Sequence, residues 1–302
     1  MSGSALCVFG DGKVADIEYR GSRCHTGGRV DEATIWEAAS LSKPLLAAHA
    51  LRLAAAGEID LDENLKVDLA SIGARPDRRW QSLTARRLLT HTSGLPNWRG
   101  PLTALAVGGA DVDSQEEALD FAGEPGDFCY SGEGFGVLLH CLAARAGVAA
   151  PEVLQSLLAW SAMTESSFVW QPRYEGAAAA PHLADGRALP KRHPSVGHPA
   201  GTLHTTLADY AGFASAVLSE GADEIFVPCF DLGEGRGRAL GWATTDTPSG
   251  VLAWQHGDNM GFKHIVALRR HKADGVLMFT NIDSGADDYR AVCRSVLGAE
   301  PF

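Results

Sequence analysis

The order of strand-like and helix-like segments constrains the fold most strongly. Residues 4–36 contain short alternating or β-branched stretches with turn signals at Asp11-Gly12 and Gly27-Gly28, a pattern typical of strands. Further strands are predicted after residue 238, over 239–245, 251–255, 263–269 and 275–280, with a closing helix over 287–297. Helical spacing of apolar residues fills the middle, over 116–122, 135–146, 151–163 and 207–218.

Strands at both ends with helices between them predict an α+β fold. We expect one antiparallel sheet built from both termini and flanked by helices, with a mostly helical inserted part. The sheet part covers about 1–39 and 226–302, the helical part about 40–225, and together they form one unit over 1–302. Residues 172–200, rich in Pro, Gly, Ala and His, are expected to form a long loop. The composition, 45% hydrophobic and 21% charged, is ordinary for a globular protein.

Ser40-Leu41-Ser42-Lys43 marks the start of the first helix. Pro44 is tolerated only in a first helical turn, so the helix begins close to Ser40, and Gly57 ends it. Residues three apart share a helix face, so Ser40 and Lys43 can point the same way. A serine nucleophile needs a neighbouring base, and a helix N-terminus favours developing negative charge. The alternatives are an N-cap serine and a solvated lysine.

Several segments resemble one known family. They are Ala39-Ser40-Leu41-Ser42-Lys43-Pro44, Gly57 to Asp62, Leu88 to Pro96, Phe128-Cys129-Tyr130-Ser131-Gly132, Pro199 to Asp209, Trp254 to Phe262 and Gly275 to Asn281. In this order they resemble the serine β-lactamase-like family, which includes class C β-lactamases, DD-peptidases and family VIII carboxylesterases. The resemblance spans roughly residues 30 to 285 and implies a β-lactamase/transpeptidase-like fold.

The resemblance also implies roles for individual residues. Ser40 is expected to attack a carbonyl, with Lys43 and Tyr130 as the proton-relay pair and His256 as a second positive charge near Tyr130. The oxyanion is expected to bind the backbone N–H of Ser40 and one N–H of the closing strand, near Asp258 or Asn259. The remaining expected substrate-site residues are Gly132, Glu133 and Gly257.

Two motifs depart from the family pattern. Gly132 stands where the family's Tyr-x-Asn has asparagine, so Glu133 or solvent is expected in the space of the missing amide. His256-Gly257-Asp258 stands where β-lactamases and peptidases carry Lys-Thr-Gly, and related esterases often have histidine there. Both departures favour a carboxylesterase acting on small or medium acyl esters. A β-lactamase or D-amino-acid (DD-)peptidase or amidase stays open, as does a catalytically inactive binding protein.

Composition limits the expected partners. The net charge of −11 and the pI near 5.4 argue against nucleic acid and anionic membrane surfaces. No run of about 18 apolar residues exists, and the N-terminal segment does not resemble a signal peptide. Six scattered cysteines indicate reduced thiols and a cytoplasmic location. The expected partner is a small-molecule ester or amide, with no cofactor or metal, and the oligomeric state stays open.

Some aromatic and histidine side chains allow two interpretations. Trp36, Trp98 and Trp254 are candidates for an apolar acyl pocket, with core or turn packing as the alternative. His91, in the turn Thr90-His91-Thr92-Ser93-Gly94, is expected to be a hydrogen-bonded structural residue rather than a catalyst.

Overall fold

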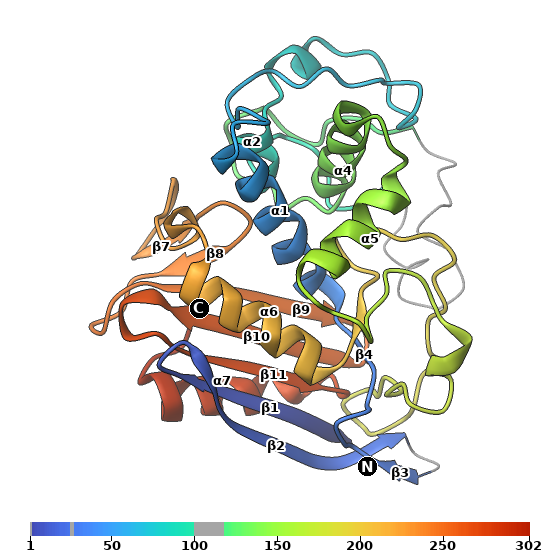
Figure 1. Cartoon of the computed structure of the whole chain (residues 1–302), viewed down its shortest axis with the longest axis vertical. Helices are drawn as coiled ribbons and strands as arrows, with labels where there is room; N and C mark the ends of the chain where they lie inside the picture. Colours follow the sequence, from blue (N-terminus) through green and yellow to red (C-terminus); the bar gives the residue numbers. More distant parts are fainter. Residues whose placement is uncertain (1, 25–26, 100–117) are drawn as a thin grey trace.

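A nine-stranded sheet lies in the lower part of the molecule as seen in Figure 1. The computed structural model describes residues 2–24, 27–99 and 118–302. The strand order is β3-β2-β1-β11-β10-β9-β8-β7-β6, and every pair of neighbours is antiparallel. The strands are β1 (Gly3–Gly10), β2 (Lys13–Cys24), β3 (Gly27–Arg29), β6 (Phe230–Gly233), β7 (Arg236–Arg238), β8 (Ala243–Thr245), β9 (Leu252–Asn259), β10 (Phe262–Arg269) and β11 (Asp274–Thr280).

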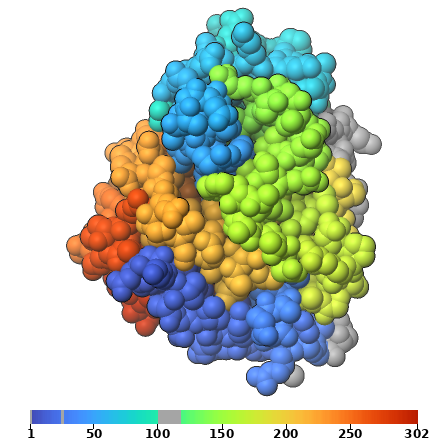
Figure 2. Space-filling view, viewed as in Figure 1, coloured from blue at the N-terminus to red at the C-terminus, as the bar shows by residue number. Residues whose placement is uncertain are grey.

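The two ends of the chain meet in the middle of this sheet. β1 lies between β2 and the C-terminal β11, with Ser4 opposite Thr280 and Phe9 opposite Gly275. Figure 2 shows the same junction on the surface, where the dark blue N-terminal segment and the red C-terminal segment lie against each other. The predicted antiparallel sheet built from both termini is therefore confirmed.

Helices cover both faces of the sheet. The buried residues of β1, Ala5, Cys7 and Phe9, alternate with half-buried ones, as expected of a strand with one face in the core. That face packs in one core cluster with residues of α6 (Leu207–Glu220). The alternate residues of β10 and β11 pack in a second cluster with α7 (Gly285–Leu297). The sheet is thus the middle layer between α6 and α7.

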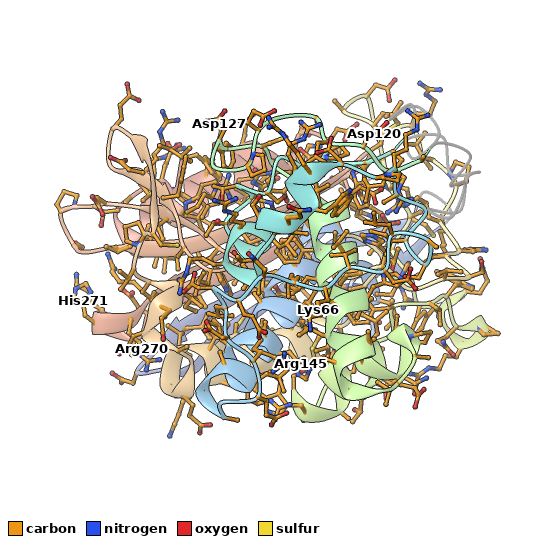
Figure 3. The ribbon with its side chains drawn as sticks, turned by 90° about the horizontal axis from the view of Figure 1, so that it is seen from above. Lys66, Asp120, Asp127, Arg145, Arg270 and His271 are labelled. Carbon is orange, nitrogen blue, oxygen red and sulfur yellow. The ribbon has the colours of Figure 1, made fainter. Side chains whose placement is uncertain are left out.

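The helical part rises above one edge of the sheet. It contains α1 (Lys43–Ala55), α2 (Ala85–Leu89), α4 (Glu133–Ala146) and α5 (Ala150–Trp160), and it shares the core cluster of α6. Figure 3 shows the exposed charges Lys66, Asp120, Asp127 and Arg145 around these helices. Within the described ranges no single helix is long and apolar enough to cross a membrane, and α4 and α5 reach that length only as a pair bent by 93°.

Of two predictions about the middle of the chain, one is corrected and one is confirmed. The helix expected over 116–122 is wrong for 118–122, where Leu119 forms an isolated bridge with Ala74; residues 116 and 117 lie outside the described residues. Backbone pairing of Leu119 with Gly73 and Arg75 replaces the helical hydrogen bonds. The long loop over 172–200 is present, interrupted by the 3₁₀ turn Pro172–Tyr174.

Candidate active site

Ser40 lies on a 3₁₀ turn that connects the sheet to α1. The turn, Ala39–Ser42, follows the short strand β4 (Trp36–Glu37), which pairs with β5 (His204–Thr205). Ala39 has φ +50°, a left-handed conformation that L-residues rarely adopt and that is often found at functional sites. It lets the chain turn sharply before Ser40, which is half-buried while its neighbours Ala39 and Leu41 are fully buried.

Lys43 begins α1 and points back to Ser40. Its Nζ lies 2.9 Å from Ser40 Oγ and donates a second hydrogen bond to the carbonyl oxygen of Ala200 at 3.0 Å. The side chain has no exposed surface, and among the described residues it pairs with no carboxylate. Burial lowers the pKa of Lys43, although the nearby Tyr130 acts in the opposite direction. A lysine held in this way is a suitable proton acceptor.

Tyr130 completes this group of side chains. Lys43 Nζ lies 4.8 Å from the centre of the Tyr130 ring. Gln255 Nε2 donates to the Tyr130 hydroxyl at 3.1 Å. Burial opposes ionisation of the phenol, but the charge of Lys43 and the polar side chains of Ser40, Lys43 and Gln255 lower the pKa of Tyr130 overall. Ser40, Lys43 and Tyr130 therefore lie together, as the sequence predicted.

His91 holds the segment that carries Tyr130. Its Nδ1 accepts a hydrogen bond from the backbone N–H of Ser131 at 3.0 Å, and its carbonyl oxygen accepts one from Cys129 at 2.8 Å. The ring centres of His91 and Tyr130 are 4.3 Å apart. Burial and the charges of Arg238 and Lys43 keep the pKa of His91 well below its ordinary value. His91 is thus a neutral structural residue, as expected from the sequence.

Gln255, rather than His256, faces Tyr130. Side chains alternate along a strand, so neighbours in β9 point to opposite faces of the sheet. Gln255 is buried and points towards Tyr130, whereas His256 stacks on Trp254, with ring centres 5.8 Å apart. Trp254 belongs to the cluster that packs against α7. The expected contact between His256 and Tyr130 is therefore not formed. Burial also lowers the pKa of His256, which favours its neutral form.

The next three residues of β9 lie beside the Ser40 turn. β8 pairs with β9 only as far as Trp254, and beyond it no described strand covers that edge. A Cβ on Gly257 would lie 2.5 Å from the carbonyl oxygen of Ala38, so only glycine allows this approach. The side chains of Asp258 and Asn259 are engaged elsewhere, with Lys263 at 2.5 Å and with the Glu37 carboxylate.

Trp98 occupies the space next to Gly132. A Cβ on Gly132 would lie 2.7 Å from the carbonyl oxygen of Asn97 and 2.9 Å from the edge of the Trp98 indole. The indole also lies 6.0 Å from Lys43 Nζ and 5.2 Å, centre to centre, from His198. The space that the sequence analysis assigned to Glu133 or solvent is therefore bounded by an aromatic ring.

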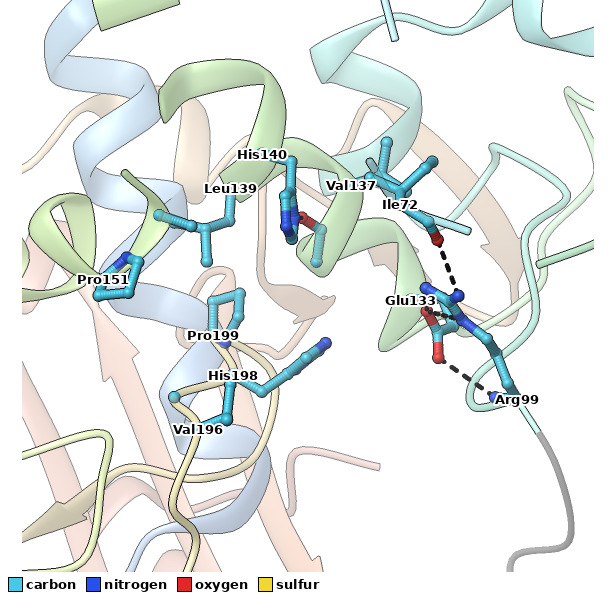
Figure 4. A pocket seen from close by; sticks show the side chains of 13 residues that line it. Ile72, Arg99, Glu133, Val137, Leu139, His140, Pro151, Val196, His198 and Pro199 are labelled. Carbon is cyan, nitrogen blue, oxygen red and sulfur yellow. Dashed lines mark hydrogen bonds and ion pairs between the residues drawn. The ribbon is translucent and has the colours of Figure 1, made fainter. Parts of the chain in front are cut away.

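Glu133 lines a cavity of about 210 Å³ whose lining does not include Ser40 (Figure 4). Its carboxylate pairs with Arg99 at 3.0 Å and accepts a hydrogen bond from the Arg99 backbone N–H. Leu139 and His140 of α4 and the segment 196–199 line the same cavity. The expectation that Glu133 takes part in the substrate site beside Ser40 does not agree with this geometry, because the buried Glu133 side chain, at the start of α4, is paired with Arg99.

Of the three tryptophans proposed for an acyl pocket, only Trp98 lies beside Lys43. Trp36 is fully buried and stacks on Phe279, and Trp254 lies on the α7 face. Sequence reasoning missed Gln255 and also Arg238 of β7, whose guanidinium lies 5.8 Å from the Tyr130 ring centre. Strand alternation was an available signal for Gln255, because Gly257 and Gln255 share a face. Within residues 2–24, 27–99 and 118–302, no group of His, Cys, Asp or Glu is arranged to hold a metal ion.

Comparisons with known proteins bear on the fold. Two solved structures superimpose on almost the whole chain. One is a class C beta-lactamase, with a TM-score of 0.79 at 19% identity, covering 98% of this chain and 90% of that one. The other is an octameric penicillin-binding protein homologue from Pyrococcus abyssi, with a TM-score of 0.80 at 21% identity, covering 99% of this chain and 74% of that one. These likenesses confirm the β-lactamase/transpeptidase-like fold.

Curated relatives match smaller parts. Penicillin-binding protein 4 of Amycolatopsis lactamdurans is 26% identical over 236 residues, which cover 73% of this chain and 60% of that protein. Esterase EstB of Burkholderia gladioli is 35% identical over 100 residues, 32% of this chain and 26% of that protein. The chain thus spans less than two thirds of the length of both. The family model described as Beta-lactamase matches residues 1–297, and the chain therefore belongs to the beta-lactamase family.

Proposed function

We propose that this protein is a serine hydrolase that forms an acyl-enzyme on Ser40, and that its substrates are esters of small or medium acyl groups. The observation that carries the proposal is the contact of 2.9 Å between Ser40 Oγ and the buried Lys43 Nζ, with the Tyr130 ring centre 4.8 Å from the same Nζ. A half-buried hydroxyl beside two groups with lowered pKa values is the arrangement that activates a serine nucleophile.

The proposed reaction has two steps. Ser40 Oγ attacks the ester carbonyl while its proton passes to the Lys43–Tyr130 pair, and the oxyanion binds the backbone N–H of Ser40 and one N–H from the uncovered edge of β9. The carbonyl–oxygen bond to the leaving alcohol breaks, and Tyr130 returns the proton to that oxygen. Water then attacks the acyl-enzyme by the same route and releases the acid and Ser40.

The substrate side of the site favours esters over β-lactams. At Gly132 the chain offers no amide side chain, and the Trp98 indole bounds that space. On β9 the position facing Tyr130 carries Gln255, a neutral side chain. An apolar wall with few polar groups binds an acyl chain better than a substrate that needs hydrogen bonds to its amide. The 35% identity with an esterase over 100 residues supports this choice.

A β-lactamase or D-amino-acid peptidase is the second candidate. The solved neighbours include a protein titled D-alanine carboxypeptidase AmpC from Burkholderia cenocepacia, with a TM-score of 0.77 over 98% of this chain. At 19% identity that likeness carries the fold alone. What favours this candidate in the chain itself is the shared Ser40–Lys43–Tyr130 group, which suits any acyl transfer.

The test is a parallel assay of the protein and its Ser40→Ala variant on p-nitrophenyl acetate, p-nitrophenyl butyrate and nitrocefin. We expect ester turnover that the variant lacks, with little opening of nitrocefin. Fast, Ser40-dependent opening of nitrocefin would support the second candidate. An equal rate in wild type and variant on every substrate would refute the serine mechanism.

A further inference from the structure

Arg238 lies beside the proposed catalytic group and forms no ion pair with any residue that the structure describes. It ends β7, where it pairs with Ala243 of β8 and Phe230 of β6. Its guanidinium carbon lies 4.8 Å from the ring centre of Phe128 and 5.8 Å from that of Tyr130. Two aromatic rings from the segment before α4 therefore hold the cation in place.

The guanidinium has no polar partner within the described part of the chain. In residues 2–24, 27–99 and 118–302 no carboxylate lies within ion-pair distance of it, and its buried Nε has no hydrogen-bond partner there. Burial lowers the pKa of Arg238 while the charge of Tyr130 raises it, and the side chain remains a cation. A half-buried cation left unpaired is costly, so its position calls for an explanation in the site itself.

Two of the side chains around Tyr130 carry a positive charge, and the others are neutral. Lys43 reaches it from the start of α1 and Arg238 from β7, and both are cationic groups. His91 and His256 have lowered pKa values and are neutral near pH 7, and Gln255 of β9 carries no charge. Among the described residues that face the phenol, Arg238 is thus the positive charge other than Lys43.

We propose that Arg238 is a positioning residue for the proposed hydrolase, and that its guanidinium, held against Phe128 and Tyr130, favours loss of a proton from the Lys43–Tyr130 pair. This inference rests on the proposed function and extends it. A positive charge at this distance stabilises the Tyr130 phenolate and destabilises the Lys43 ammonium. It therefore favours loss of the proton whether Tyr130 or Lys43 carries it. β7 thereby supplies the charge that β9 lacks.

The first experiment measures kcat/KM for p-nitrophenyl butyrate against pH in wild type, Arg238→Gln, Arg238→Lys and Arg236→Gln. Arg236 is the matched control, because it lies on the same strand two residues earlier but is exposed and pairs with Glu234 at 2.9 Å. Removing the charge of Arg238 should lower kcat/KM about tenfold near neutral pH and move the acid limb up by about one pH unit. At high pH kcat/KM of Arg238→Gln should approach the wild-type value. Arg238→Lys keeps the positive charge and should stay close to the wild-type pH profile, and Arg236→Gln should match the wild type.

The second experiment follows tyrosinate absorbance and needs no turnover. The chain has five tyrosines, and the pKa values of Tyr19, Tyr174, Tyr210 and Tyr289 are all raised, so Tyr130 should ionise first. Tyr130→Phe should remove this first step and Arg238→Gln should move it to higher pH. If Arg238→Gln moves this step to higher pH but the wild type hydrolyses no ester, the proposed function fails, while the effect of the Arg238 charge on the Lys43–Tyr130 pair stands.

Three results would overturn the inference. In one, Arg238→Gln keeps the wild-type pH profile and tyrosinate step. In another, kcat/KM falls by the same factor at every pH, which indicates a packing role. The last is a loss confined to 3-acetoxybenzoate, with phenyl acetate unaffected, because a guanidinium that only binds a substrate carboxylate would give that pattern.

Discussion

At the scale of single residues, the site depends on which side of β9 each side chain occupies. Gln255 donates to the Tyr130 hydroxyl at 3.1 Å, whereas its neighbour His256 stacks on Trp254 on the other face. We therefore predict that Gln255→Ala lowers kcat/KM on p-nitrophenyl butyrate about five- to tenfold, the worth of one hydrogen bond, while His256→Ala stays within about twofold. A larger loss for His256→Ala than for Gln255→Ala would restore the sequence-based assignment.

The glycine at position 132 gives a prediction about stability. Because a Cβ there would lie 2.7 Å from the backbone oxygen of Asn97, we expect Gly132→Ala to lower the free energy of unfolding by about 1–3 kcal/mol. Gly212 of α6 is the control, since it has nothing within 4 Å of its Cβ position, and Gly212→Ala should stabilise by about 0.5–1 kcal/mol. Urea unfolding measures the free energy of unfolding of both variants. A Gly132→Ala variant as stable as the wild type, or more stable, would contradict the packing described around Trp98.

At the scale of elements, His264 joins the sheet to the strand that leads to Ser40. The backbone N–H of Thr280 donates to His264 Nδ1 at 3.1 Å, so Nε2 carries the proton and donates to the Glu37 carbonyl at 3.0 Å. We predict that His264→Phe lowers the unfolding free energy by about 2 kcal/mol or more, because it leaves both backbone groups unpaired. His271→Phe, at an exposed position after β10, should change it by less than about 0.5 kcal/mol. Similar urea midpoints for the two variants would refute the link.

How far the sequence predicts these elements depends on the kind of signal. Helices α4, α5, α6 and α7 and the C-terminal strands were predicted within a few residues, because their apolar periodicity is strong. The helix expected over 116–122 was wrong for 118–122, since Leu119 is buried by a bridge to Ala74 that local spacing does not reveal. The order of the family-like segments predicted that Ser40, Lys43 and Tyr130 lie together. Arg238 comes from a separate hairpin that no motif marks, so it was not predicted.

At the scale of the whole molecule, buried neutral histidines connect stability to pH. Burial lowers the pKa of His49 and of His264 to about 4, whereas an unfolded histidine titrates near 6.5. The unfolded chain therefore binds more protons below about pH 6.5, and stability is lost as the pH falls towards the folded pKa values. Each of the two contributes a loss of about 1.4 kcal/mol per pH unit in that range.

The measurement is urea unfolding of the wild type at several pH values between neutral and about pH 5. The urea midpoint should fall steadily as the pH decreases. In His264→Phe the free energy of unfolding should depend less steeply on pH, because one of the histidines that bind a proton on unfolding is missing. A wild-type midpoint that does not change over this range would mean that these histidines are protonated in the folded protein or exposed to water.

The central claim is that Ser40 carries the acyl group. The most direct test is the intact mass of the protein, quenched during turnover of p-nitrophenyl acetate, for wild type and for Ser40→Ala, followed by peptide mapping of the product. The account predicts one added acetyl group on Ser40 in the wild type and none in the variant. An acetyl group that persists in Ser40→Ala, or steady wild-type turnover with acetyl found only on another residue, would contradict it.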